Sequence, residues 1–292
     1  MLKIQGLKKQ LRGIRSTKKL TKAMRTVSTV KFSKLNEIYN EYSKYGKRCR
    51  DVFEQYGSFF ENTFRAADPQ APSLVLVMAS NKGLCGKFNA EILHFADEKL
   101  EEMDSALVAA CGKMAIQYFQ GKGRKLEKKY ELQDIPVYGE SNSIMEDILT
   151  WRQEGKISQV YIIYPQYVNM MIQMPKMCKL FSEKACEEEE SNILFLPDKA
   201  TVNKNVAKLV FHALFHEFIL ETALGAQAAT LMTMRSAYDT ATEYYEEIEG
   251  EINRMRQSAV TADVIETSAE RKEEGIWQKD QKGWSFESQV LL

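Results

Sequence analysis

The positions of the prolines constrain this chain more than any other feature of its sequence. All six lie in the middle of the 292 residues, at positions 69, 72, 136, 165, 175 and 197, so both ends are free of proline. Proline breaks the interior of a helix because it lacks a backbone N–H and clashes with the preceding turn. Each proline-free end can therefore form one long helix, and the segment between them must be built differently.

The N-terminal segment carries a seven-residue apolar repeat. Alternating steps of three and four join Leu35, Ile38, Tyr42, Tyr45, Cys49, Val52, Tyr56 and Phe59. The same phase extends back through Ser28, Met24, Thr21, Ile14 and Leu7, which are smaller or more polar on average. This is the spacing of the a and d positions of a left-handed coiled coil. It predicts a helix of about 60 residues, roughly 90 Å long.

The C-terminal segment repeats the pattern. One series recurs every seven residues, and a second lies three residues after members of the first: Leu224, Leu231, Tyr238, Tyr245, Ile252 and Ala259, then Met234, Ala241, Ile248, Met255 and Ala262. A helix is predicted from about Asn205 to about Glu270. Two such helices can fold back on each other, so the sequence predicts a long antiparallel two-helix coiled coil.

The net charge of zero conceals an uneven distribution. Residues 1–50 hold fifteen Lys or Arg and two Glu, so this stretch alone has a net charge of +13. Such a helix needs an anionic neighbour, which could be nucleic acid, lipid headgroups or an acidic protein. The basic side chains are spread along a heptad helix, which favours a protein over nucleic acid. No apolar run reaches the roughly 20 residues that would span a bilayer, so the chain is not expected to cross a membrane.

Residues 73–196 alternate short apolar runs with helical patterns. Strands are predicted at 74–78, 106–110, 160–164 and 170–181, with a last one at 193–195, and helices at 88–103, 114–120 and 144–153. Strands that alternate with short helices indicate βαβ units and a small, mostly parallel sheet. The five cysteines are odd in number and form no CxxC pair, which is typical of reduced structural thiols.

Two motifs could carry chemistry. Ser80–Asn89 follows a strand and opens a helix, as phosphate-binding loops do, but Asn81 and Phe88 stand where such a loop needs Gly and Ser or Thr. The interpretation as a tight packing turn is favoured, although a nucleotide site at Gly83–Lys87 stays open. His212 and His216 have the spacing of zinc ligands, but no third ligand is near, which favours a structural pair. No catalytic residues, metal ligands or cofactor-binding residues are predicted.

Three segments together resemble the gamma subunit of the F-type ATP synthase family. Residues 17–27 with Lys31 are similar to the family pattern TxKITxAMxxV…K, and residues 80–89 to SDRGLCGGFN. Residues 228–237 and 253–261 are similar to AARMMAMxxA and NKxRQAxIT. Their order and spacing agree over nearly the whole chain. The chain departs from the family at Gly225–Gln227, at Val264–Glu270, and in a polar tail that follows.

The resemblance implies a rotor stalk that is no enzyme by itself and couples ion translocation to ATP synthesis or hydrolysis. Its fold would be a coiled coil plus a Rossmann-like domain, divided as 1–68, 73–196, 200–270 and a tail at 271–292. Its partners would be the alpha and beta subunits, the epsilon subunit and the membrane c-ring, at the cytoplasmic face of a bacterial plasma membrane, without nucleotide or cofactor of its own. The implied contact residues for the alpha/beta ring are Lys18, Lys22, Met24, Arg25, Arg256, Gln257, Thr261 and Asp263. A non-rotary coiled-coil scaffold remains the alternative.

Overall fold

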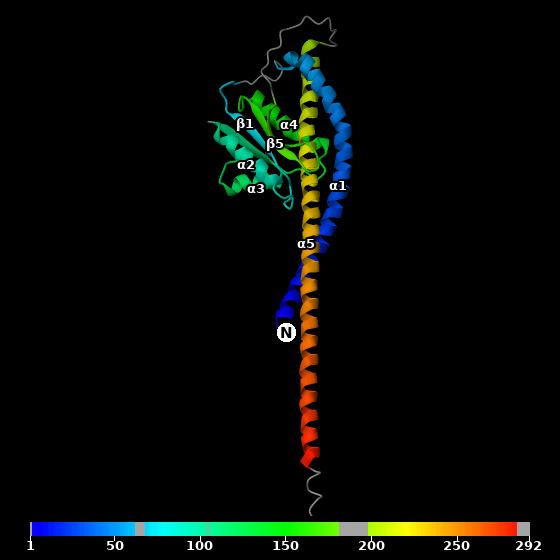
Figure 1. Ribbon diagram of the computed structural model, residues 1–292. Coiled ribbons are helices and arrows are strands. Elements are labelled where there is room, and N and C mark those ends of the chain that lie inside the picture. Colours follow the sequence, from blue (N-terminus) through cyan, green and yellow to red (C-terminus); the bar gives the residue numbers. More distant parts are fainter. Residues whose placement is uncertain (1, 62–67, 104, 181–197, 285–292) are drawn as a thin grey trace, which may run out of the picture. The chain divides into compact units, whose positions relative to one another are not determined.

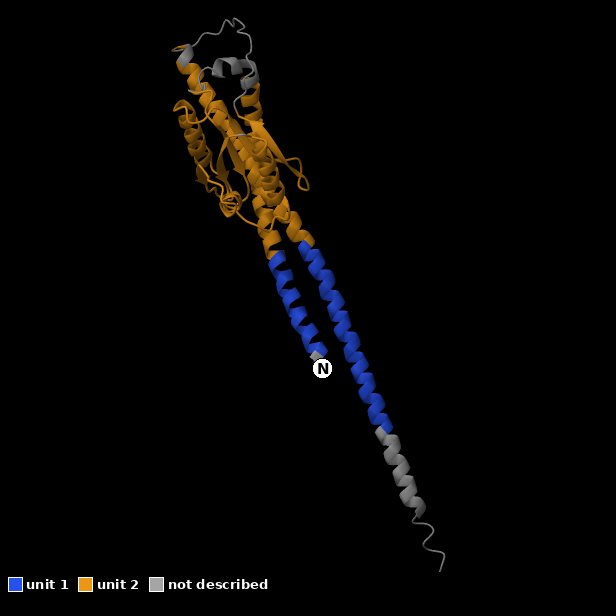
Figure 2. Cartoon of the chain, turned by 90° about the vertical axis from the view of Figure 1, so that its left-hand side faces the viewer, with its two compact units in different colours: residues 1–21, 237–292 blue, residues 22–236 orange. Residues whose placement is uncertain are grey.

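The computed structural model describes residues 2–61, 68–103, 105–180 and 198–284. By spatial contact the chain divides into two compact units, one of residues 1–21 and 237–292 and the other of residues 22–236 (Figure 2). Helix α1 (Leu2–Glu61) and helix α5 (Lys199–Trp284) each contribute to both units. The four-part division expected from the sequence stays a prediction. The strand expected at 193–195 lies outside the described residues.

The larger unit contains a five-stranded sheet (Figure 1). Its strands are β1 (Ser73–Met78), β2 (Ala106–Cys111), β3 (Lys128–Tyr130), β4 (Val160–Tyr167) and β5 (Gln173–Lys179), in the order β3-β2-β1-β4-β5. All neighbours are parallel except β4 and β5, which form an antiparallel pair. The expected mixed α/β fold with a mostly parallel sheet is confirmed, and its strand order is that of a Rossmann-like sheet with one reversed edge.

Helices cover both faces of this sheet. Helices α2 (Phe88–Glu101) and α3 (Lys113–Gly121) pack on one face, against Val75 and Val77 of β1. Helix α4 (Tyr138–Gln153) and part of α5 pack on the other, against Leu74 and Leu76. Because alternate residues of a strand point to opposite faces, the continuous apolar run of β1 supplies both cores.

Helix α4 begins six residues before the expected start at Ile144. Pro136 cannot continue a helix backward, and the backbone N–H of Val137 donates to the Glu140 carboxylate at 3.1 Å. The same carboxylate accepts from the backbone of Gln133 at 3.0 Å. Glu140 therefore fixes the loop and satisfies the free donors of the first turn.

Within the larger unit, the α1 and α5 segments run antiparallel. Cys49 of α1 clusters with Val210 and Ala213 of α5, and Arg50 pairs with Glu217. The heptad positions Thr21, Ser28, Leu35 and Cys49 are buried as expected.

The assignment of Tyr45 to the seam of α1 is wrong. Tyr45 is 39% exposed, and the adjacent Gly46 is buried in its place. The reason is that a side chain of α5, Glu217, fills the space over Gly46. The ring of Tyr45 instead packs edge-on against Tyr42, with 5.6 Å between ring centroids.

Helix α5 contains a stretch that is apolar enough to cross a membrane. Within Thr201–Ala269, an 18-residue window has a mean hydropathy of 1.3, and 78% of that window is buried inside the protein. The core helix of a soluble protein passes the same test of length and composition, so the stretch is weak evidence for a membrane span.

Candidate partner-contact surface

In the smaller unit, the first turns of α1 pair with the middle of α5. The ammonium of Lys18 lies over the rings of Tyr238 and Tyr245, at 5.3 and 5.7 Å from their centroids, and Lys3 reaches Glu251 at 3.8 Å. Residue numbers rise on one helix as they fall on the other, so the pairing is antiparallel. Among the described residues, the contact of Lys3 with Glu251 marks the end of this pairing.

The part of α5 beyond this pairing lies in solvent. Met255 is half-buried, and every described side chain of residues 256–269 is exposed; we call residues 256–269 the exposed segment. The predicted seam residues Ala259 and Ala262 are therefore not buried, because no described residue of α1 lies opposite them. This part of the seam assignment is wrong for the chain alone.

The exposed segment holds four of the eight predicted contact residues: Arg256, Gln257, Thr261 and Asp263. The Thr261 hydroxyl donates to the backbone carbonyl of Gln257 at 2.9 Å, so both are fixed to one helix turn. The guanidinium and amide groups can offer several N–H donors to a partner in the geometry that suits carboxylates and backbone carbonyls.

Apolar side chains that the motif comparison did not identify share this segment. Val260, Val264 and Ile265 are 55, 57 and 64% exposed. The signal was available in the sequence, because these aliphatic side chains lie within the predicted helix beside the motif residues. Arginine, amides and exposed aliphatic side chains together make a surface suited to protein contact.

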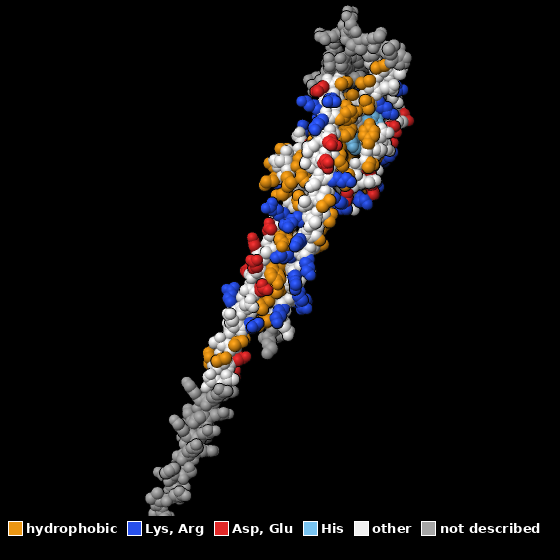
Figure 3. Space-filling view, turned by 90° about the vertical axis from the view of Figure 1, so that its right-hand side faces the viewer, with side chains coloured by type: hydrophobic (Ala, Val, Ile, Leu, Met, Phe, Trp, Pro, Cys, Tyr) orange, Lys and Arg blue, Asp and Glu red, His pale blue; other side chains and the backbone are white. Residues whose placement is uncertain are grey.

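The other four predicted contact residues lie on α1. Lys18 belongs to the smaller unit and is half-buried by its two tyrosine rings. Lys22, Met24 and Arg25 belong to the larger unit, where Lys22 is exposed and the other two are half-buried. Basic side chains of the first turns stand in solvent (Figure 3): Lys3, Lys8, Lys9, Arg12, Arg15 and Lys19. The positive charge expected there is available to an acidic partner.

The loop that resembles a phosphate-binding loop is closed by its own hydrogen bonds. Asn89 accepts from the backbone N–H of Ser80 at 3.1 Å and donates to the Ser80 hydroxyl at 2.8 Å and to the Cys85 sulfur at 3.0 Å. Leu84 and Gly86 both adopt positive φ, at 64° and 60°. The loop is a tight packing turn, as the sequence favoured.

Helix α5 fills the crevice where this strand order would place a nucleotide. Such ligands bind at the carboxyl ends of the strands, where the strand order reverses. Here the Thr222 hydroxyl lies 3.8 Å from the Met78 sulfur, and Ala226 is buried in the same cluster as Ala79 and Phe88. The remaining cavity has a volume of about 50 Å³, whereas pockets for small ligands hold about 300–1,000 Å³.

The two histidines of α5 are buried and lie in separate environments. His216 Nδ1 lies 2.8 Å from the Ser141 hydroxyl, and its ring contacts Tyr42 edge-on at 4.8 Å. Burial lowers the pKa of His216 to about 4. His212 is 2% exposed, and neither ring nitrogen has a hydrogen-bond partner. No cluster of three metal-ligating side chains occurs among the described residues, in keeping with a structural pair.

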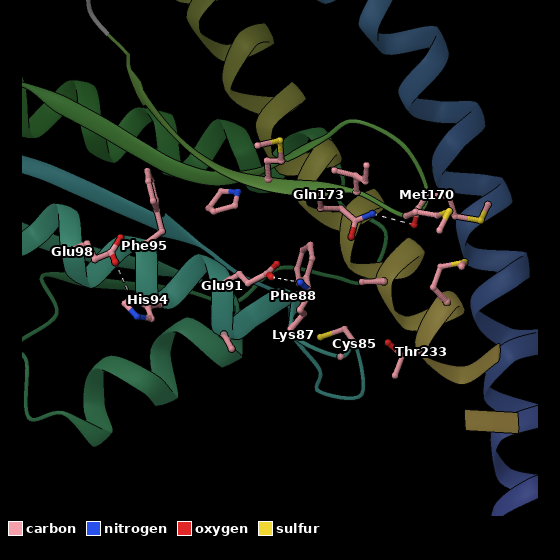
Figure 4. Close-up of a pocket in the computed structure, with 18 residues that line it drawn as sticks. Cys85, Lys87, Phe88, Glu91, His94, Phe95, Glu98, Met170, Gln173 and Thr233 are labelled. Atoms are coloured by element: carbon pink, nitrogen blue, oxygen red, sulfur yellow. Dashed lines mark hydrogen bonds and ion pairs between the residues drawn. The ribbon is translucent and has the colours of Figure 1, made fainter. Parts of the chain in front are cut away.

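A shallow apolar groove of about 780 Å³ opens on the larger unit (Figure 4). Its floor includes Phe88, Phe95 and Met232, and the β4–β5 connection forms one wall. The polar groups on the α2 side are occupied by one another, as Lys87 pairs with Glu91 and His94 with Glu98. The groove therefore offers mainly apolar contact area.

The fold combines two long helices, paired antiparallel within each unit, with a Rossmann-like domain. The sequence matches the family described as ATP synthase over residues 3–269. The chain therefore belongs to the ATP synthase gamma-subunit family, as its motifs indicated.

Two relatives are similar to this chain over most of their length. The chain is 25% identical to the ATP synthase gamma chain of Pelotomaculum thermopropionicum, covering 91% of this chain and 97% of that one. It is 26% identical to the gamma chain of Clostridium acetobutylicum, covering 89% and 94%.

Two solved structures share the fold. One comes from the Euglena gracilis mitochondrial ATP synthase, described as OSCP/F1/c-ring in rotational state 3. It matches with a TM-score of 0.62 and 14% identity, and the match covers 99% of this chain and 97% of that one. The other, described as the rotor of the same enzyme in rotational state 1, has a TM-score of 0.62, 16% identity, and coverage of 88% and 99%.

Proposed function

We propose that this chain is the central rotor stalk of an F-type ATP synthase. It mechanically couples ion translocation through a membrane ring to ATP synthesis or hydrolysis in an alpha/beta hexamer. The observation that carries the proposal is the exposed segment, a stretch of α5 whose described side chains all lie in solvent. The family match includes this segment, since it extends to residue 269.

The mechanism requires a stiff element and a contact surface whose individual contacts are weak enough to exchange. Antiparallel pairing of α1 and α5 supplies the first within each unit. The exposed segment supplies the second, because its polar side chains stand in solvent, where a single ion pair contributes at most about 1 kcal/mol. Contacts of that strength can form and break as successive subunits meet the stalk.

The proposed partners follow from the same reasoning. The alpha and beta subunits meet Met24, Arg256, Gln257, Thr261 and Asp263, and acidic parts of the ring meet Lys18, Lys22 and Arg25. The epsilon subunit and the membrane c-ring meet the Rossmann-like domain. The chain itself is non-catalytic and acts as a peripheral subunit at the cytoplasmic face of a bacterial plasma membrane.

Co-purification tests this proposal against a non-rotary scaffold. A tagged chain is expressed in its source cell, the membrane-bound complex is isolated, and the subunits are counted by quantitative mass spectrometry. The proposal predicts one copy per three catalytic beta subunits, together with epsilon and c-ring subunits. Recovery without catalytic subunits, or at a one-to-one ratio with them, would favour the scaffold.

A further inference from the structure

Helix α5 places two buried carboxylates one turn apart in the larger unit. Glu217 and Glu221 are 6 and 8% exposed. Side chains four residues apart lie on the same face of a helix, with about 5–6 Å between their Cβ atoms. Both acids are therefore held in one poorly solvated region, where two negative charges repel each other strongly.

The two carboxylates have different partners. Glu217 accepts from Arg50 of α1 and lies against Gly46. Glu221 accepts from the backbone N–H of Tyr167, at the end of β4, at 2.8 Å. The pair thus connects α5 to α1 on one side and to the sheet on the other.

The cation Arg50 is in direct contact with the pair, through Glu217. The other titratable groups around Glu221 are Tyr39 of α1, Tyr164 of β4 and Lys176 of β5. The tyrosines are neutral near pH 7, because burial raises the pKa of Tyr39 to about 12 and also raises that of Tyr164. Lys176 is exposed, so water screens its charge.

The charge balance therefore favours one bound proton. With Glu217 ionised and paired to Arg50, a neutral Glu221 leaves the cluster without net charge, and an ionised Glu221 leaves one buried negative charge. Burying such a charge without a partner is costly. Burial raises the pKa of Glu221 to about 7, opposed by the hydrogen bond from Tyr167 and assisted by the charge of Glu217.

We propose that Glu221, beside the ion pair of Glu217 and Arg50, holds a proton in the folded chain, and that release of this proton leaves a buried negative charge that destabilises the packing of α5 in the larger unit. The fold then carries a pH-sensitive device, which goes beyond the proposed stalk function. The sign follows from linkage. A carboxyl whose folded pKa is raised binds more protons in the folded chain between its ordinary pKa of 4.5 and about 7. Its stabilising effect is present at low pH and is lost as the pH rises through about 7.

Urea unfolding of the full-length chain tests this proposal, with wild type and Glu221→Gln compared at steps from pH 5 to pH 8.5. Glutamine keeps an acceptor for Tyr167 but carries no titratable charge. At each pH, the equilibrium constant for unfolding of the wild type is divided by that of the variant. This ratio should rise by up to about a hundredfold from pH 5 to pH 8.5. Glu37→Gln, at an exposed position of α1, should leave the same ratio constant. A ratio for Glu221→Gln that does not change with pH would overturn the proposal.

Infrared spectroscopy gives a second measurement that needs no folded variant. The wild-type chain with ¹³C-labelled glutamate should show the absorption of a protonated, buried glutamic acid that disappears as the pH is raised through about 7. A spectrum without a protonated glutamate at pH 6 would contradict the proposal, even if Glu221→Gln failed to fold.

Discussion

Glu217 of α5 occupies the space that a side chain at Gly46 of α1 would fill. A Cβ atom on Gly46 would lie 2.5 Å from Oε2 of Glu217 and 2.9 Å from its Cδ. Arg50, one turn further along α1, donates to the same carboxylate. The absence of a side chain at position 46 is therefore what allows a charged residue of one helix to lie against the backbone of the other.

The substitution Gly46→Ala should destabilise the chain although alanine is the better helix former. Glu217 is buried and held by Arg50, so it cannot move aside without losing that partner. We expect a net loss of about 1–3 kcal/mol in the free energy of unfolding, as for other overpacked sites, measured by urea denaturation. Gly13→Ala, on the same helix with nothing within 4 Å, should instead gain about 0.5–1 kcal/mol. Equal gains from both variants would contradict this packing.

The substitution Gly112→Ala should be far more damaging. Gly112 has a φ of 92°, and a Cβ there would lie 2.1 Å from the backbone oxygen of Ala79. The backbone cannot shift, because Gly112 donates to Tyr130 at 2.8 Å and Ala79 donates to Cys111 at 2.9 Å. We expect the free energy of unfolding to fall by more than about 4 kcal/mol, which is a large part of the stability of a marginally stable domain. Soluble yield and melting temperature should fall with it.

Gly123→Ala is the matched control for that variant. Gly123 also has a positive φ, 71°, but nothing lies within 4 Å of its Cβ position. Only the cost of the left-handed backbone applies, about 1–2 kcal/mol. If the two alanine variants melted at the same temperature, the contact with Ala79 would not be the cause.

Long-range packing explains which parts of the fold the sequence could predict. The continuous apolar run of β1 and the heptads of α1 and α5 are local sequence patterns, and they predict these elements correctly. Strand β3 was missed because Lys128, Lys129 and Tyr130 have no apolar run, and its existence depends on pairing with β2. The role of Gly46 was equally hidden, since it depends on a residue 171 positions further along the chain. The contact residues were proposed by motif alone, and local pattern does not specify a partner that is another chain.

Buried His216 should make stability depend on pH. Burial lowers the pKa of His216 to about 4, so below pH 6.5 the unfolded chain takes up a proton that the folded chain does not. Stability is then lost as the pH falls, by about 1.5 kcal/mol between pH 6.5 and pH 5 from this residue. His216→Gln should remove that contribution. The difference between variant and wild type, taken from urea midpoints at each pH, separates it from other titrating groups. A difference that is constant with pH would contradict the assignment.

The double substitution Arg256→Ala with Gln257→Ala should impair coupling without affecting the fold. Both side chains are exposed, so stability should change by no more than about 0.5 kcal/mol. The loss of charged and amide contacts to a partner, each contributing up to about 1 kcal/mol, should lower ATP synthesis in energised membrane vesicles several-fold. Arg254→Ala, an exposed neighbour on the same helix, serves as the control. Unchanged synthesis by the double variant would show that these residues are not the contact.

Rotation observed in single molecules tests the central claim most directly. The isolated catalytic complex is fixed to a surface through its beta subunits, and a bead is attached to a cysteine introduced at the exposed residue Lys122 of the Rossmann-like domain. The account predicts stepwise rotation in one direction when ATP is added, and none when ATP is withheld. A bead that stays fixed while the same complexes hydrolyse ATP would contradict the account, because a stalk that couples the two motors must turn with each cycle.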